Sequence, residues 1–210
     1  MTRYAFAERL ALAHQMERVG PDAPTLCGEW TVRELLAHLL LRERRPDAAV
    51  GILIKRFGAR TEHVQRDISA GDFAALLAAL RRPPWWSPVS NVLLDELTNL
   101  TEMFVHHEDV RRAQAGWAPR ELSHGLEAAL FTRVRAWARL ALRRYPATVR
   151  IETPGFGSVK AGTASPDVLT LSGPPGELLL FLFGRQAHAR AELSGPPEAA
   201  ERLRRARLGI

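Results

Sequence analysis

The sequence predicts a mainly helical protein in two parts: a helical bundle over residues 1–145 and a small α+β domain over residues 146–210. Up to residue 144, apolar residues recur at close to the 3.6-residue period of an amphipathic helix. Beyond Tyr145-Pro146 they fall into short β-type runs separated by Gly- and Pro-rich turns. We therefore expect the Tyr145–Pro146 junction to separate two compact units.

Helix start and stop signals divide the first part into segments. The first helix carries Phe6, Leu10, Leu12 and Met16 as candidate core positions and closes at Gly20. The second begins at a capping box formed by Thr31 and Glu34. Pro46 and Asp72 can each open a shorter helix. The expected helices cover residues 3–19, 31–44, 46–57, 73–80, 90–114 and 120–144, the last with Leu126, Leu130, Val134, Trp137 and Leu140 facing inward.

The second part alternates strand-like runs with turns. A Gly-rich turn at 154–157 separates two of the runs and reads as a hairpin. The expected strands cover residues 148–152, 158–161, 168–171 and 189–193, and short helices are expected over 176–183 and 197–207.

Composition narrows the class of protein. The chain has 210 residues, of which 46% are hydrophobic, so a core of ordinary size is available. The first residues lack the apolar stretch of a signal peptide, no apolar run could span a membrane, and a single cysteine excludes an internal disulfide, so we expect a cytoplasmic protein. The net charge of +6 comes almost entirely from arginines interleaved with acidic residues, which argues against a nucleic-acid partner.

The segment 102–109, within the long helix expected over 90–114, holds the first candidate site. Glu102 and His106 are four residues apart and therefore lie one above the other on the same helical face, and Asp109 continues their stripe. A carboxylate and an imidazole placed in this way can ligate one divalent metal ion. Many helices carry the same pair on a solvated surface, so the pair alone does not identify a site.

His38 strengthens this interpretation. It is the one histidine of the helix expected over 31–44, and by itself it is compatible with a hydrogen-bonded core histidine. Helical bundles, however, build metal sites from inward-facing residues of neighbouring helices. Two histidines and a carboxylate, His38, His106 and Glu102, would give three ligands and leave an open position, as in catalytic zinc sites and in comparable iron or nickel sites.

Other reactive residues around these positions are given different roles. His107 is rotated by about 100° from His106 and should not reach the same ion, and Glu108 is expected on the surface. Asp109 could orient His106 or a bound water. Cys27 precedes a helix start, which favours a thiolate, but no base is adjacent in sequence, so we expect Cys27 to be dispensable for activity.

Two motifs resemble those of a known family. Pro24-Thr-Leu-Cys-Gly-Glu-Trp-Thr-Val-Arg-Glu-Leu-Leu-Ala-His-Leu39 and Glu102-Met-Phe-Val-His-His-Glu-Asp-Val-Arg-Arg-Ala113 resemble the mycothiol-dependent maleylpyruvate isomerase family of the DinB-like metal-binding superfamily. The tail, with Leu-Ser-Gly-Pro-Pro-Gly-Glu-Leu and Phe-Gly-Arg185, is similar to the small domain that follows such bundles. The motifs are specific for the superfamily, and many relatives share them without an assigned reaction.

The resemblance implies a DinB-like four-helix bundle whose zinc-like ion is bound by His38, Glu102 and His106. It also implies mycothiol as a low-molecular-weight thiol co-substrate that binds near the metal as a thiolate, adds to a conjugated double bond of a small molecule, and is eliminated after rotation. An arginine of the tail, with Arg185 as the candidate, could hold an acidic substrate. A homodimer is left open.

The alternative is a non-enzymatic protein of stress response or regulation that binds the metal without a reaction. The sequence does not identify the substrate.

Overall fold

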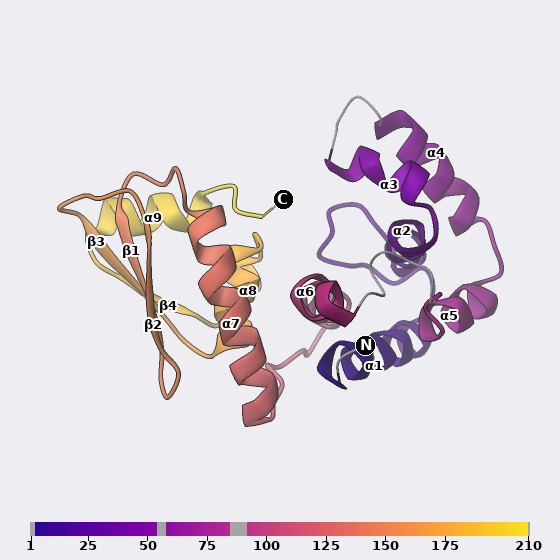
Figure 1. Ribbon diagram of the computed structural model, residues 1–210, viewed down its shortest axis with the longest axis horizontal. Coiled ribbons are helices and arrows are strands. Elements are labelled where there is room, and N and C mark those ends of the chain that lie inside the picture. Colours follow the sequence, from indigo (N-terminus) through magenta and orange to yellow (C-terminus); the bar gives the residue numbers. More distant parts are fainter. Residues whose placement is uncertain (1–2, 54–57, 85–91, 210) are drawn as a thin grey trace. The chain divides into compact units, whose positions relative to one another are not determined.

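The computed structural model describes residues 3–53, 58–84 and 92–209, and it divides into two compact units, Met1–Ala118 and Pro119–Ile210 (Figure 1). We call them the N-terminal and the C-terminal unit and describe each by itself. None of the helices in the described ranges combines the length and apolar character needed to cross a bilayer.

The N-terminal unit is helical throughout its described elements. These are α1 (Arg3–Val19), α2 (Val32–Arg44), α3 (Pro46–Leu53), α4 (Gly58–Ser69), α5 (Phe73–Arg81) and α6 (Val92–Arg112). The expected helices over 3–19, 31–44 and 73–80 are confirmed to within a residue. Helix α4 had not been predicted. The end of the helix expected over 46–57, the start of the one expected at Ser90, and Trp85 and Trp86 lie outside the described residues.

The core of the N-terminal unit is built mainly from α1, α2, α5 and α6. Helix α1 packs along α6, and α2 contacts α4 and α5. The fully buried apolar side chains include Leu12, Met16, Leu36 and Met103. Two expected core residues, Phe6 and Leu10, are instead 40% and 39% exposed, because the buried face of α1 runs through Ala5, Leu12, Ala13 and Met16 and also contains Arg9.

The C-terminal unit combines helices with a four-stranded sheet (Figure 1). Its elements are α7 (His124–Ala141), β1 (Thr148–Thr153), β2 (Gly157–Gly162), β3 (Val168–Ser172), α8 (Pro175–Leu182), the 3₁₀ turn η3 (Gln186–His188), β4 (Glu192–Ser194) and α9 (Pro197–Arg205). The strand order is β2-β1-β3-β4, with β1 and β3 parallel and the other pairs antiparallel. The expected hairpin at 154–157 joins β1 to β2, where Thr153 pairs with Gly157.

The boundary between the units differs from the expected one. The change from helical to strand-like periodicity at Tyr145-Pro146 is real, since β1 begins at Thr148. The compact C-terminal unit, however, begins at Pro119 and so includes α7, because α7 packs against α8 and β2. Of the positions expected to face inward on α7, Leu126, Leu130 and Val134 are buried, whereas Leu140 is 47% exposed.

Candidate metal centre

The loop that precedes α2 fixes the start of that helix and so the position of His38. The Glu34 carboxylate accepts hydrogen bonds from the backbone N–H of Thr31 at 2.7 Å and from its hydroxyl at 3.0 Å, which supports the predicted cap. The backbone N–H of Val32 donates to the carbonyl of Ala23 at 2.9 Å. These bonds hold the first turn of α2, and His38 follows on the next turn.

Helix α6 carries the other two expected ligands. Glu102 and His106 lie on adjacent turns, and His106 Nε2 is 3.3 Å from Glu102 Oε2. The side chain of Glu102 is 28% exposed and that of His106 is 12% exposed, so one side of the pair remains open to solvent. The face predicted from the four-residue spacing is therefore the face on which the two groups meet.

His38 of α2 completes a three-residue group with Glu102 and His106. One ligand atom from each residue lies within 4.8 Å of the other two. The His38 ring packs edge-on against His106, with 5.9 Å between ring centroids, and Trp30 packs against His38 at 5.1 Å. The structure thus brings together the three side chains that were expected to bind a metal.

Asp109 and Cys27 hold the opposite edge of the His106 ring. The Nδ1 atom of His106 is 3.0 Å from Asp109 Oδ2, and the Cys27 thiol donates to the same carboxylate oxygen at 3.1 Å. Asp109 is fully buried, and its backbone carbonyl accepts from Leu26 N at 3.2 Å, which ties the Cys27 loop to α6. Asp109 therefore takes the orienting position expected for it, since an Nδ1–H donated to this carboxylate leaves the Nε2 lone pair on the side of Glu102.

The surroundings shift the three pKa values in different directions. Burial, assisted by the nearby charge of His106, lowers the pKa of His38 to about 4. Burial opposes ionisation of Glu102, but the hydrogen bond from His106 and the charge of Arg42 outweigh it and lower the pKa of Glu102 to about 2. Burial likewise opposes the charged form of His106, yet hydrogen bonds with Asp109, Cys27 and Glu102 raise its pKa well above 6.5.

The donor set fits a divalent ion of the zinc type. Zinc bonds of about 2.0–2.2 Å place neighbouring ligand atoms of a tetrahedron about 3.3–3.6 Å apart. The 3.3 Å separation between His106 Nε2 and Glu102 Oε2 already has this length. The ligand atom of His38 lies within 4.8 Å of both. Two imidazoles and one carboxylate leave the fourth position for water or another ligand.

A second group, Cys27, His106 and Asp109, also places its donor atoms within 4.8 Å of one another. It uses the Nδ1 edge of the His106 ring. To bind an ion there, the fully buried Asp109 carboxylate would have to give up its hydrogen bonds with His106 and Cys27. The group with His38 requires no such loss at Asp109, and it is the more open of the two. The group of His38, Glu102 and His106 is therefore the better candidate for a metal centre.

The neighbouring residues of α6 serve the interior of the unit. His107 is 5% exposed, and its Nδ1 is 3.0 Å from Glu8 Oε2 of α1, so it faces away from the centre as predicted. Glu108 is not on the surface as expected. It is 1% exposed, and its carboxylate accepts from Arg112 Nε at 2.6 Å and from Arg111. The Arg112 guanidinium lies over the ring of Trp117.

Sequence patterns missed three residues beside the centre. Gln65 of α4 lies beside His38 and donates through Nε2 to the carbonyl of Glu34 at 3.3 Å. Arg42 of α2 donates through Nη1 to Asn99 Oδ1 of α6 at 3.1 Å. Arg42 follows His38 by one turn and Asn99 precedes Glu102 by about one turn, a spacing that could have indicated both. Gln65 carried no such signal, since α4 itself was not predicted.

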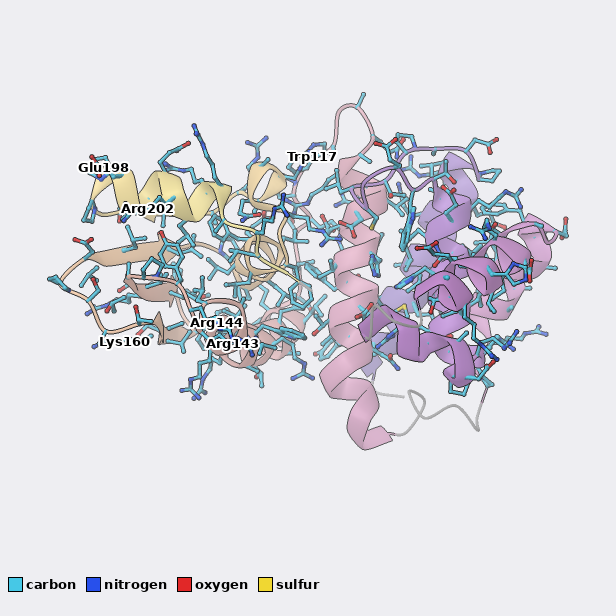
Figure 2. The ribbon with its side chains drawn as sticks, turned by 90° about the horizontal axis from the view of Figure 1, so that it is seen from above. Trp117, Arg143, Arg144, Lys160, Glu198 and Arg202 are labelled. Atoms are coloured by element: carbon cyan, nitrogen blue, oxygen red, sulfur yellow. The ribbon has the colours of Figure 1, made fainter. Side chains whose placement is uncertain are left out.

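Arg185, the tail arginine expected to hold a substrate, belongs to the C-terminal unit. Its Nη1 donates to the carbonyl of Phe183 at 2.5 Å. The same unit has a pocket of about 410 Å³ lined by Trp137, Leu140, Phe183 and others. Arg143 and Arg144, which are labelled in Figure 2, also line it. Arg185 is not among the residues that line this pocket, and its expected role stays a prediction.

Comparisons with known proteins add no relative. No family model, no curated protein and no solved structure matches this chain. The candidate metal centre therefore depends on the geometry of His38, Glu102 and His106 itself.

Proposed function

We propose that this protein binds one divalent metal ion, with zinc as the best fit and nickel or iron as alternatives, and catalyses a thiol-dependent transfer or isomerisation of a small molecule. The observation that carries the proposal is the convergence of His38, Glu102 and His106 from two helices. The resemblance of the two motifs to mycothiol-dependent enzymes of the DinB-like superfamily supplies the thiol and the class of reaction.

Each residue has a defined role in this proposal. His38, with a pKa of about 4, is neutral near pH 7 and presents a free lone pair, and Glu102 supplies a negative charge. Asp109 fixes the His106 ring and increases its basicity. A bound ion would lower the pKa of a coordinated thiol and orient its sulfur for attack. The side chain of Glu102 is 28% exposed, so a thiol or a substrate could approach the ion from solvent on this side.

The geometry favours an external thiol over Cys27 as the nucleophile. The Cys27 sulfur is 3.6 Å from His106 Nδ1, so a histidine does lie beside it, contrary to the expectation from sequence. That nitrogen is also 3.0 Å from the Asp109 carboxylate, however, and the thiol donates to the same carboxylate. With Nδ1–H directed to Asp109, His106 has no lone pair on this side to deprotonate Cys27.

The test is metal analysis of protein purified without an affinity tag, followed by turnover assays with mycothiol and a panel of electrophiles. We expect about one ion per chain. His38→Ala, Glu102→Ala and His106→Ala should each remove most of it, because two remaining ligands hold an ion poorly. His63→Ala is the matched control, since His63 also faces a carboxylate at i+4, Asp67, but is 69% exposed.

The outcomes separate the alternatives. Metal-dependent turnover supports the enzyme. Full metal content without turnover of any electrophile favours a non-enzymatic metal-binding protein. Metal content that survives all three ligand substitutions contradicts the proposed centre. Loss of turnover in Cys27→Ala, with fold and metal retained, would replace the external thiol by a cysteine mechanism.

A further inference from the structure

Arg42 places a positive charge beside the candidate metal centre. It lies on α2 one turn after His38, and its Nη1 donates to Asn99 Oδ1 at 3.1 Å. Asn99 lies on α6, about one turn before Glu102, and is 1% exposed. The Arg42–Asn99 pair therefore bridges the same two helices as the metal ligands, about 5 Å further along them.

The charge balance at this position calls for an anion. Arg42 is half-buried, and among the described residues no carboxylate lies within ion-pair distance of its guanidinium. A divalent ion at His38, Glu102 and His106 would add further positive charge, and a cation beside a cation site weakens metal binding unless an anion joins them.

The hydrogen bond to Asn99 fixes the guanidinium without neutralising it. An amide oxygen takes one of the five N–H groups of arginine and carries no charge, so the remaining donors and the full charge stay available. A planar guanidinium held in this way is suited to a carboxylate, which it can bind through two parallel hydrogen bonds.

We propose that Arg42, positioned by Asn99, is a specificity-determining residue that selects small-molecule substrates with a carboxylate about one helical turn from the atom that meets the metal. The inference rests on the proposed function, because it needs the metal at the neighbouring turn. It assigns substrate recognition to the N-terminal unit itself and to a residue of the same helix as His38.

The test uses protein loaded with cobalt(II), whose visible spectrum reports ligands that reach the metal. The probes are succinate, which can offer one carboxylate to the metal and one to Arg42, and its neutral diamide, succinamide. We expect the wild type to bind succinate more tightly than succinamide. Arg42→Gln should weaken succinate binding about tenfold or more without changing succinamide binding or the metal content.

Two further variants keep the result interpretable. Asn99→Asp places a carboxylate beside the guanidinium at almost unchanged shape, so it should weaken succinate binding while leaving the metal content and the fold intact. Arg33→Gln is the control for loss of an arginine from α2, because Arg33 donates to the carbonyls of Ser69 and Gly71 and not toward the metal ligands. It should leave succinate binding unchanged.

The failures are distinguishable. If the wild type binds no metal, the proposed function fails and the inference falls with it. If the wild type binds metal but Arg42→Gln and Asn99→Asp bind succinate as well as the wild type does, the inference alone is wrong. Loss of metal in Arg42→Gln would also overturn it, because that result would make Arg42 a support of the metal site.

Discussion

Helices α6 and α8 are both buried, but the residues they bury differ in polarity. Every residue of α8 is buried, and from Leu178 to Leu182 the helix is entirely apolar. The half of α6 that follows residue 98 is almost as well buried, but it carries a dense set of polar groups: Asn99, Thr101, Glu102, His106, His107, Glu108 and Asp109. In the sequence α8 is a continuous apolar run, whereas α6 is indicated by apolar residues at helical spacing, such as Leu97, Leu100 and Phe104.

The comparison shows what distinguishes a site from a buried polar group. Charged groups inside a protein are costly unless they are paired, and α6 pairs them: His107 with Glu8, and Glu108 with Arg112. In these contacts each carboxylate faces a nitrogen donor of histidine or arginine. His38, Glu102 and His106 instead converge as three donors around one point, which is an arrangement for an ion. Convergence, more than burial, identifies the candidate centre.

The largest expected effect is a loss of stability, without a loss of metal content, when a core leucine of α8 is shortened. Leu180 of α8 is fully buried, so Leu180→Ala should lower the free energy of unfolding by about 2–5 kcal/mol through lost contacts and a cavity. Metal content per folded chain should be unchanged. Chemical denaturation and metal analysis measure the two quantities. Leu140→Ala is the control, because a side chain that is 47% exposed should cost about 0.5 kcal/mol or less. Equal losses in the two variants would contradict the assignment of α8 to the core.

His107 tests whether a polar residue of α6 can matter for stability without belonging to the centre. His107→Ala removes the imidazole that contacts the buried Glu8 carboxylate and should cost about 1–3 kcal/mol of stability, while metal content stays nearly unchanged. The double variant with Glu8→Ala should recover part of the loss, as a double-mutant cycle would show. If metal vanished in His107→Ala but survived in His38→Ala and Glu102→Ala, the inward face of α6 would have been misassigned.

Local signals in the sequence predicted much of this molecule. The Thr31/Glu34 cap located α2, and the four-residue spacing of Glu102 and His106 located the polar face of α6, because both signals depend on residues close in the chain. Long-range packing decided the rest. The contacts of α7 with α8 and β2 moved the unit boundary to Pro119, and the fold carried Cys27 to His106 across 79 positions. Arg111 and Arg112 pair with Glu108 at helical spacing within α6, so the sequence could have indicated these pairs, but it did not indicate that Glu108 is buried.

Asp109 should tune the metal without binding it. Asp109→Asn replaces the charged acceptor of His106 Nδ1–H by a neutral one, which should lower metal affinity by about 10–100-fold. Chelator competition measures this change. The loss should be greatest at high pH. At lower pH it is partly offset, because the substitution also lowers the pKa of His106, so that protons compete less with the metal for this ligand. A complete loss of binding at every pH would make Asp109 a ligand, as in the group with Cys27.

The smallest expected effect is the change of metal affinity with each pH unit. In the metal-free protein the pKa of His106 is raised well above 6.5, whereas His38, with a pKa of about 4, is already neutral near pH 7 and Glu102 is ionised. Zinc or cobalt must therefore displace one proton, that of His106. Between about pH 5 and the pKa of His106, affinity should rise about tenfold per pH unit, which corresponds to about 1.4 kcal/mol. Below about pH 4 the slope should steepen as His38 takes up a second proton.

The sign of this pH dependence follows from two preferences: the metal-free protein is stabilised by protonated His106, whereas the metal binds neutral His106. Protonated His106 is stabilised by Asp109 and Glu102, so the metal-free fold gains stability from it below pH 6.5 and loses that gain as pH rises through the raised pKa. Metal affinity rises over the same pH range, because a proton no longer competes with the metal for His106. Calorimetric titration in buffers of different ionisation enthalpy should report release of about one proton at pH 6. If no proton is released at pH 6, His106 is already neutral in the metal-free protein. The hydrogen bonds between its ring and the Asp109 and Glu102 carboxylates would then not raise its pKa as proposed.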